Sequence, residues 1–186
     1  MSVARRGFLP IVILVLIACA ACQRRSDLPT YDTVPVFTMT ASDGSTFHSQ
    51  QLAGKVWIAD FIYTNCPGPC PRMTSQMHHL QLQVRGEPDV QLVSFSVDPH
   101  RDTPKVLNAY AKHFGGPAAD WVFLTGSDAT THLLAHDVFK VGDLINVMDH
   151  STRFILVDRK GVIRGYYSTF DADDMHKLMQ DVQTLR

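Results

Sequence analysis

A nearly continuous apolar run, KVWIADFIYT at residues 55–64, ends directly before a loop that holds two cysteines, Cys66 and Cys70. A run of this kind, rich in Val, Ile, Phe and Tyr, predicts a strand that is covered on both faces of a sheet. The segment after Pro71, RMTSQMHHLQLQV, repeats apolar residues at helical spacing and predicts a helix. Strand, cysteine loop and helix follow one another, so Cys70 is expected at the N-terminus of a helix.

Further strands and helices alternate along the rest of the chain. The expected elements are a hairpin turning at 42–44, a strand at 90–98, a helix from Thr103 to Gly115, a strand at 121–126, a helix at 129–139, a hairpin turning at 159–161 and a helix at 171–185. This order predicts an α/β chain with a thioredoxin-like fold and an added N-terminal β-hairpin. The folded domain is expected to span residues 35–186.

The N-terminus, MSVARRGFLPIVILVLIACAAC, predicts a signal peptide or a membrane or lipid anchor at residues 1–22. Its apolar run at 8–21 is shorter than the roughly 20 residues that a spanning helix needs. The segment LIAC at 16–19 resembles the bacterial lipobox and predicts lipidation of Cys19, with an uncleaved anchor as the alternative. The polar residues 23–34 predict a tether between the membrane and the domain.

Such an N-terminus places the domain outside the cytoplasm, in a compartment where thiols tend to oxidise. Only Cys66 and Cys70 remain in the part of the chain that is expected to fold. In a chain long enough to build its own core, an isolated pair predicts a working site, and a purely structural disulfide is the alternative. The 17 basic and 18 acidic residues nearly cancel and form no dense basic block, which excludes nucleic acid as a partner.

The cysteine loop permits two kinds of chemistry. At a helix N-terminus, unpaired N–H groups favour the thiolate, which both attacks disulfides and binds metals. The three residues between Cys66 and Cys70 leave room for a shared metal ion, and their Cα atoms can still approach within about 6 Å for a disulfide. Two thiolates with one imidazole suit copper, so the choice between the alternatives depends on a histidine.

Of the nine histidines, His150 has the most informative position. It lies directly before a predicted strand, where thioredoxin-like proteins have a loop that packs against the cysteine loop. His132 and His136 have the i, i+4 spacing of a helical metal pair, but any polar helix face shows the same spacing.

Three motifs resemble those of the SCO/SenC family, TxCPxxCP, VDPxRDTP and DH[ST]. They are TNCPGPCP at 64–71, VDPHRDTP at 97–104 and DHST at 149–152. The resemblance implies a copper chaperone that binds one copper ion, as Cu(I) or Cu(II), through Cys66, Cys70 and His150. It also implies delivery of that ion to the binuclear copper centre of cytochrome c oxidase subunit II, on the periplasmic side of the bacterial inner membrane.

Family members also reduce the cysteines of that centre, so a periplasmic thiol-disulfide oxidoreductase is the alternative function. Cys66 would then attack and Cys70 would resolve, with a thioredoxin-like protein as reductant or as copper donor. Asp98 in the second motif would orient His150 or hold the loop, or it is a turn residue at a strand end. The family usually has an acidic residue at the position of Gly68 and often histidine or threonine at that of Asn65, so the charge beside the site is changed.

Overall fold

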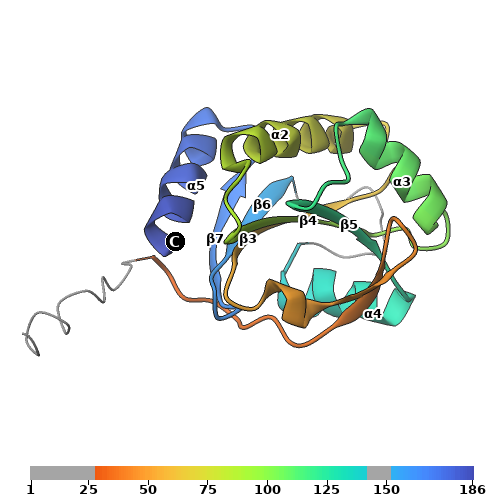
Figure 1. Ribbon diagram of the computed structural model, residues 1–186, viewed down its shortest axis with the longest axis horizontal. Helices are drawn as coiled ribbons and strands as arrows, with labels where there is room; N and C mark the ends of the chain where they lie inside the picture. The colour runs from red at the N-terminus through yellow and green to blue at the C-terminus, as the bar shows by residue number, and fades with distance from the viewer. Residues whose placement is uncertain (1–27, 142–151) are drawn as a thin grey trace, which may run out of the picture.

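The computed structural model describes residues 28–141 and 152–186, which form one seven-stranded sheet with helices on both faces (Figure 1). The strands lie in the order β2-β1-β5-β4-β3-β6-β7. Their bounds are β1 Thr38–Ala41, β2 Thr46–His48, β3 Val56–Ile62, β4 Val90–Ser96, β5 Trp121–Thr125, β6 Arg153–Val157 and β7 Ile163–Ser168. The helices are η1 Ser49–Leu52, α2 Pro69–Val84, α3 Pro104–His113, α4 Asp128–His132, the π-helical η2 Leu133–Val138 and α5 Ala172–Leu185. The predicted α/β thioredoxin-like fold with an N-terminal hairpin is confirmed.

The centre of the sheet consists of parallel strands that are buried along their whole length. Every residue of β3 and β4 is buried, as the continuous apolar run predicts. β3 pairs in parallel with β4, and β4 pairs in parallel with β5. The hairpin β1–β2 adds to the edge of β5, and β6–β7 adds to the edge of β3, in both cases antiparallel. Within the described ranges, no helix combines the length and apolar character needed to cross a membrane.

The helices cover the two faces of the sheet unequally. α2 and α3 lie over one face, and α4 with η2 lies over the other (Figure 1). On the α4 face the fully buried ring of Phe139 packs against Trp57, Phe61 and Phe95, with ring centroids 5.3–5.9 Å apart. This aromatic cluster fixes the end of η2 against the strands that lead to the cysteine loop.

The helix predicted at 129–139 differs from the observed one. The α-helical part ends at His132, and a π-helical turn follows in which the Phe139 N–H donates to the Leu134 carbonyl at 2.8 Å. The extra residue in the turn keeps Leu134, Ala135, Val138 and Phe139 all buried against the sheet. The requirement to bury Phe139 thus overrides regular α-helical geometry.

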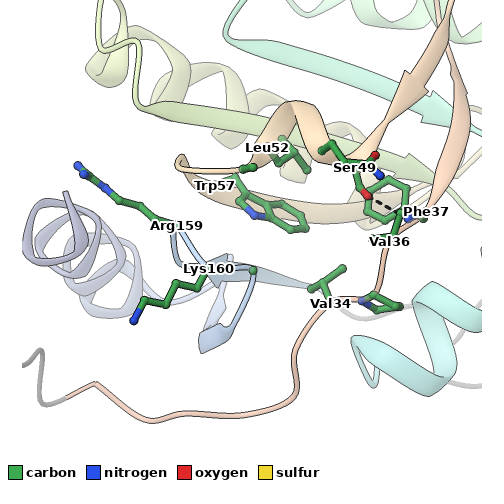
Figure 2. Close-up of a pocket in the computed structure, with 12 residues that line it drawn as sticks. Val34, Val36, Phe37, Ser49, Leu52, Trp57, Arg159 and Lys160 are labelled. Atoms are coloured by element: carbon green, nitrogen blue, oxygen red, sulfur yellow. Dashed lines mark hydrogen bonds between the residues drawn. The ribbon is translucent and has the colours of Figure 1, made fainter.

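Residues 28–34, which the sequence assigns to a tether, lie along the beginning of β7. The Tyr31 N–H donates to the Ile163 carbonyl at 2.9 Å, and the Val34 N–H donates to the Gly161 carbonyl at 2.8 Å. A pocket of about 210 Å³ lies between this segment and the β6–β7 turn, and its lining includes Val34 and Trp57 (Figure 2). Because Trp57 is near the start of β3, this region lies at the end of β3 away from the cysteine loop.

Candidate metal centre

Three chain segments meet at one end of the central strands, and the cysteine loop is one of them. The parallel pairing of Ile62 with Ser96 places the end of β3 beside the end of β4. β6 runs antiparallel to β3 with Ala59 opposite Ile155, so β6 begins at the same end. The loops after β3 and β4 and the start of β6 therefore meet here.

The two cysteines lie where the sequence predicts. Cys66 is in the loop after β3, and Cys70 is the second residue of α2, which begins at Pro69 and therefore earlier than the apolar spacing predicts. Both side chains are present as thiols and both are buried, Cys66 with 7% of its surface exposed and Cys70 with none. The outer sulfur, Cys66, is the one that a partner can reach.

The two thiols have opposite acidities. Burial opposes ionisation of Cys66, but hydrogen bonds from the Cys70 thiol and from the main-chain N–H groups of Cys70 and Gly68 outweigh it and lower its pKa. Burial raises the pKa of Cys70, and its hydrogen bond to Cys66 raises it further. Cys66 is thus the more acidic of the two thiols, and the Cys70 thiol donates a hydrogen bond to it. Two sulfurs this close can share one metal ion or join in a disulfide.

Asp102 holds the cysteine loop to the end of β4. Its buried carboxylate accepts hydrogen bonds from the Thr64 N–H at 3.1 Å, the Thr64 hydroxyl at 2.5 Å and the Ser96 hydroxyl at 2.6 Å. Thr64 is two residues before Cys66, so these bonds fix the start of the loop. The sequence placed Asp102 in a motif but gave no sign of this role, since its partner in the cysteine loop, Thr64, is 38 residues away along the chain.

Asp98 is nearly buried in the turn after β4. Its carboxylate accepts a hydrogen bond from Arg101 at 2.9 Å, and its main-chain carbonyl accepts one from the Asp102 N–H at 2.9 Å. Burial raises the pKa of Tyr63 to about 12, and the hydrogen bond to Cys66 and the charge of Asp98 also raise it. Asp98 therefore lies close enough to the site for its charge to influence Tyr63. Its hydrogen bonds with Arg101 and Asp102 also agree with the alternative prediction, a turn residue at the end of a strand.

A buried carboxyl group, Asp60, lies on β3 on the side of the cysteines. Burial raises its pKa to about 7, and the nearby Ser94 side chain offsets this only in part. Neither carboxylate oxygen of Asp60 has a hydrogen-bond partner within the described residues. Its charge also contributes to the raised pKa of Cys70. Thr74 connects the same region to α3, because its hydroxyl bonds the Cys70 carbonyl at 2.9 Å and the Tyr110 hydroxyl at 2.7 Å.

Two predicted site residues, His150 and Cys19, lie outside the described residues. Within residues 28–141 and 152–186, no third histidine, cysteine or carboxylate joins the cysteine pair in a group of metal-ligand spacing. The described group with that spacing is His132, His136 and Asp137, on another part of the fold. A donor set of two sulfurs, of which Cys66 is the more acidic thiol, fits a soft metal ion such as Cu(I).

Comparisons with known proteins agree with this arrangement. The SCO1/SenC family model matches residues 25–185. The SCO1 protein homolog of Bacillus subtilis (strain 168) is 34% identical over 182 residues, which cover 94% of this chain and 92% of the relative. BsSco, a member of the Sco family of cytochrome c oxidase assembly proteins in which a disulfide switch was identified, matches with a TM-score of 0.75 at 35% identity, over 88% of this chain and 98% of its own.

A copper-bound structure also matches. ScoI of Arabidopsis thaliana with copper bound has a TM-score of 0.65 at 25% identity, and the match covers 82% of this chain and 97% of that one. The family match extends over the whole described domain, and the cysteine motif stands at the junction of β3 and α2. This chain belongs to the SCO1/SenC family.

Proposed function

We propose that this protein is a copper chaperone that binds one copper ion through Cys66, Cys70 and His150. It delivers the ion to the binuclear copper centre of cytochrome c oxidase subunit II. The observation that carries the proposal is the pair of contacting thiols at the N-terminus of α2, of which one has a lowered pKa. Copper in the Arabidopsis relative and the link of BsSco to oxidase assembly support the same use here.

The position of β6 supports His150 as the third ligand. The Thr169 N–H and hydroxyl both donate to the Thr152 carbonyl, at 3.0 and 2.8 Å, and the Gln76 side chain donates to the Thr169 carbonyl at 2.5 Å. These bonds fix Thr152 beside α2, the helix that carries Cys70. Only one residue separates His150 from Thr152 in the sequence.

The unequal thiols suggest an order of binding. Cys66, whose pKa is lowered, ionises more readily than Cys70 and binds the incoming ion first. Cys70 has a raised pKa, so it loses its proton only when the ion binds, and uptake releases a proton. Delivery reverses this order through exchange of ligands with the acceptor, and reprotonation of Cys70 favours release.

We further infer that the N-terminus holds the domain at the periplasmic side of the bacterial inner membrane. Residues 1–22 are the signal or anchor, with Cys19 as the lipidated residue. Residues 23–34 are the tether, and its last part, residues 28–34, packs on β7. The periplasmic reductant or copper donor reaches the site through the less buried Cys66.

Thiol-disulfide reduction is the second candidate, and the opposite acidities of the cysteines favour it. The Cys66 thiolate attacks a partner disulfide, forms a mixed disulfide and releases one partner thiolate. Cys70 then loses its proton to solvent and attacks the Cys66 sulfur, which releases the second partner thiolate. The partner gains two electrons and the domain becomes a Cys66–Cys70 disulfide, which a thioredoxin-like reductant restores to thiols.

Anaerobic copper titration of the wild type, His150→Ala and the control His176→Ala tests the proposal. Loss of one of three ligands is expected to weaken copper binding by at least about tenfold and to change the Cu(II)-thiolate absorption band. His176 is an exposed residue of α5 whose ring bonds Gln180, so its replacement is expected to change neither quantity. Equal affinity and an unchanged band in His150→Ala contradict the ligand assignment. Disulfide reduction that survives His150→Ala without copper supports the second candidate.

A further inference from the structure

A second cluster of metal-ligating side chains lies on the last turns of α4 and η2. His132, His136 and Asp137 each offer one ligand atom, and the three atoms lie within 4.8 Å of one another. Imidazole nitrogen and carboxylate oxygen are ligands that divalent copper, zinc and nickel accept. All three residues are exposed, so an ion can reach them directly from solvent.

The π-helical turn brings these side chains to one side of the helix. In a regular α-helix, residue i+5 points about 140° away from residue i, which would separate Asp137 from His132. η2 instead closes with an i→i+5 hydrogen bond between Phe139 and Leu134. Each circuit of this wider turn takes more residues, which rotates Asp137 back toward His132.

Contacts within the cluster show that the side chains already lie together. The His132 and His136 rings stack with centroids 5.0 Å apart and an interplanar angle of 28°. The Nδ1 atom of His136 lies 2.7 Å from the Asp137 carboxylate. This hydrogen bond lowers the pKa of Asp137, which keeps the carboxylate charged and ready to bind a cation. Lys140 is a positive charge near the cluster that disfavours a bound cation, and its ammonium donates to the Asp137 main-chain carbonyl.

The helix that carries the cluster is packed firmly against the sheet. The other face of η2, with Leu134, Ala135 and Val138, is buried, and Phe139 is fixed in the aromatic cluster under the sheet. α4 and η2 lie on the face of the sheet opposite α2, the helix that carries Cys70 (Figure 1). The histidine cluster is therefore separate from the cysteine loop.

We infer that His132, His136 and Asp137 form a second metal site that takes one divalent transition-metal ion, independently of the cysteines. Two imidazoles and one carboxylate bind Cu(II) more tightly than Ni(II) or Zn(II), as the general order of affinities for nitrogen and oxygen ligands requires. The exposed position leaves room for water or a partner's ligand to complete the coordination.

Titration of the full chain without a histidine tag tests this inference in a Cys66→Ser/Cys70→Ser background. CuCl₂ and ZnCl₂ are the probes, and isothermal titration with electron paramagnetic resonance of Cu(II) gives the readout. The background protein is expected to bind one Cu(II) with nitrogen couplings. His132→Gln or His136→Gln is expected to weaken binding by at least about tenfold and to remove one nitrogen coupling. Because Cys66 and Cys70 are replaced in every variant, and Cys19 and Cys22 are the same in all of them, a difference between the variants is independent of the chaperone proposal.

His100→Gln is the matched control, since His100 forms a single exposed imidazole–carboxylate pair with Asp128 at 2.9 Å. It is expected to leave the affinity for Cu(II) unchanged. Equal affinity and an equal spectrum in the background protein, His132→Gln and His136→Gln overturn the inference, as does an equal loss in His100→Gln. Thermal unfolding without metal verifies that the variants fold. With CuCl₂ the melting temperature is expected to rise in the background protein and not in His136→Gln.

Discussion

At the scale of single residues, Asp60 on β3 and Asp102 in the loop after β4 are two buried carboxylates with different effects. Asp102 is buried but accepts hydrogen bonds from Thr64 and Ser96, which compensate for its removal from water. Asp60 is buried beside Ser94 with much less compensation, and its pKa is raised to about 7. One carboxylate therefore stabilises the cysteine loop, and the other makes the folded state sensitive to pH.

Asp60→Asn is expected to stabilise the metal-free reduced protein at pH 8 but not at pH 4. The folded carboxyl has a pKa of about 7 and the unfolded one about 3.8. Relative to a charged carboxylate at this position, the protonated carboxyl of Asp60 stabilises the folded state. This contribution to the free energy of unfolding is full below pH 3.8, falls as the pH rises, and is lost above about pH 7. Removing the charge recovers up to about 4 kcal/mol at pH 8, at about 1.4 kcal/mol for each pKa unit. Urea unfolding at pH 4, 6 and 8 measures this.

The control for Asp60 is Asp43→Asn, in the exposed β1–β2 turn. Hydrogen bonds from Ser45 lower the pKa of Asp43, so its charge favours the folded state and its removal gives no gain at pH 8. A gain for Asp60→Asn that is equal at pH 4 and pH 8 would exclude ionisation as its cause.

Asp102→Asn is expected to loosen the cysteine loop. The amide retains one acceptor oxygen but sets an NH₂ group against the hydroxyl and N–H donors that the carboxylate now satisfies. A loss of about 1–3 kcal/mol of unfolding free energy is expected, with faster amide hydrogen exchange at residues 64–68. Asp128→Asn, which alters an exposed carboxylate, is the control. Unchanged exchange at 64–68 would show that Asp102 does not hold the loop.

At the scale of elements, the strands and helix ends could be predicted from the sequence, and the π-helical turn could not. β3 follows from its apolar run, and Thr103 and Asp171 accept the capping hydrogen bonds expected at the starts of α3 and α5. Residues 133–138 show ordinary amphipathic spacing, but the position of Phe139 depends on rings from β3 and β4. Local patterns do not contain such distant contacts.

Some residues of the candidate site could likewise be predicted from the sequence, and others could not. Motifs predicted Cys66 and Cys70, because residue type and spacing carry that signal. Asp102 was not predicted, because its function arises only when the ends of β3 and β4 come together. His150 stays a prediction from its motif.

At the scale of the whole molecule, Arg164 ties the N-terminal segment to the sheet. Its guanidinium donates to the Leu28 carbonyl at 2.9 Å and the Pro29 carbonyl at 2.7 Å, and it pairs with Asp158 at 2.9 Å. The sequence predicted only a polar tether here, because main-chain carbonyls bind the arginine and leave no side-chain pattern.

Arg164→Lys is expected to release residues 28–34 and leave the domain folded. Lysine keeps a positive charge near Asp158 but lacks the planar fork that reaches two carbonyls at once. Hydrogen exchange at the Tyr31 and Val34 amides is expected to rise, and that at β3 amides to stay slow. Arg85→Lys, on the exposed end of α2, is the control. Protected Tyr31 and Val34 amides in Arg164→Lys would contradict this role.

The attachment of residues 28–34 near the start of β3 also determines how far the cysteine loop lies from the N-terminal attachment. The cysteine loop follows the other end of that strand, and seven strand residues at about 3.3 Å each span roughly 20 Å. With the N-terminus anchored as proposed, the sheet acts as a spacer that points the cysteines away from the bilayer. A copper acceptor must then present its copper site at that distance above the membrane surface.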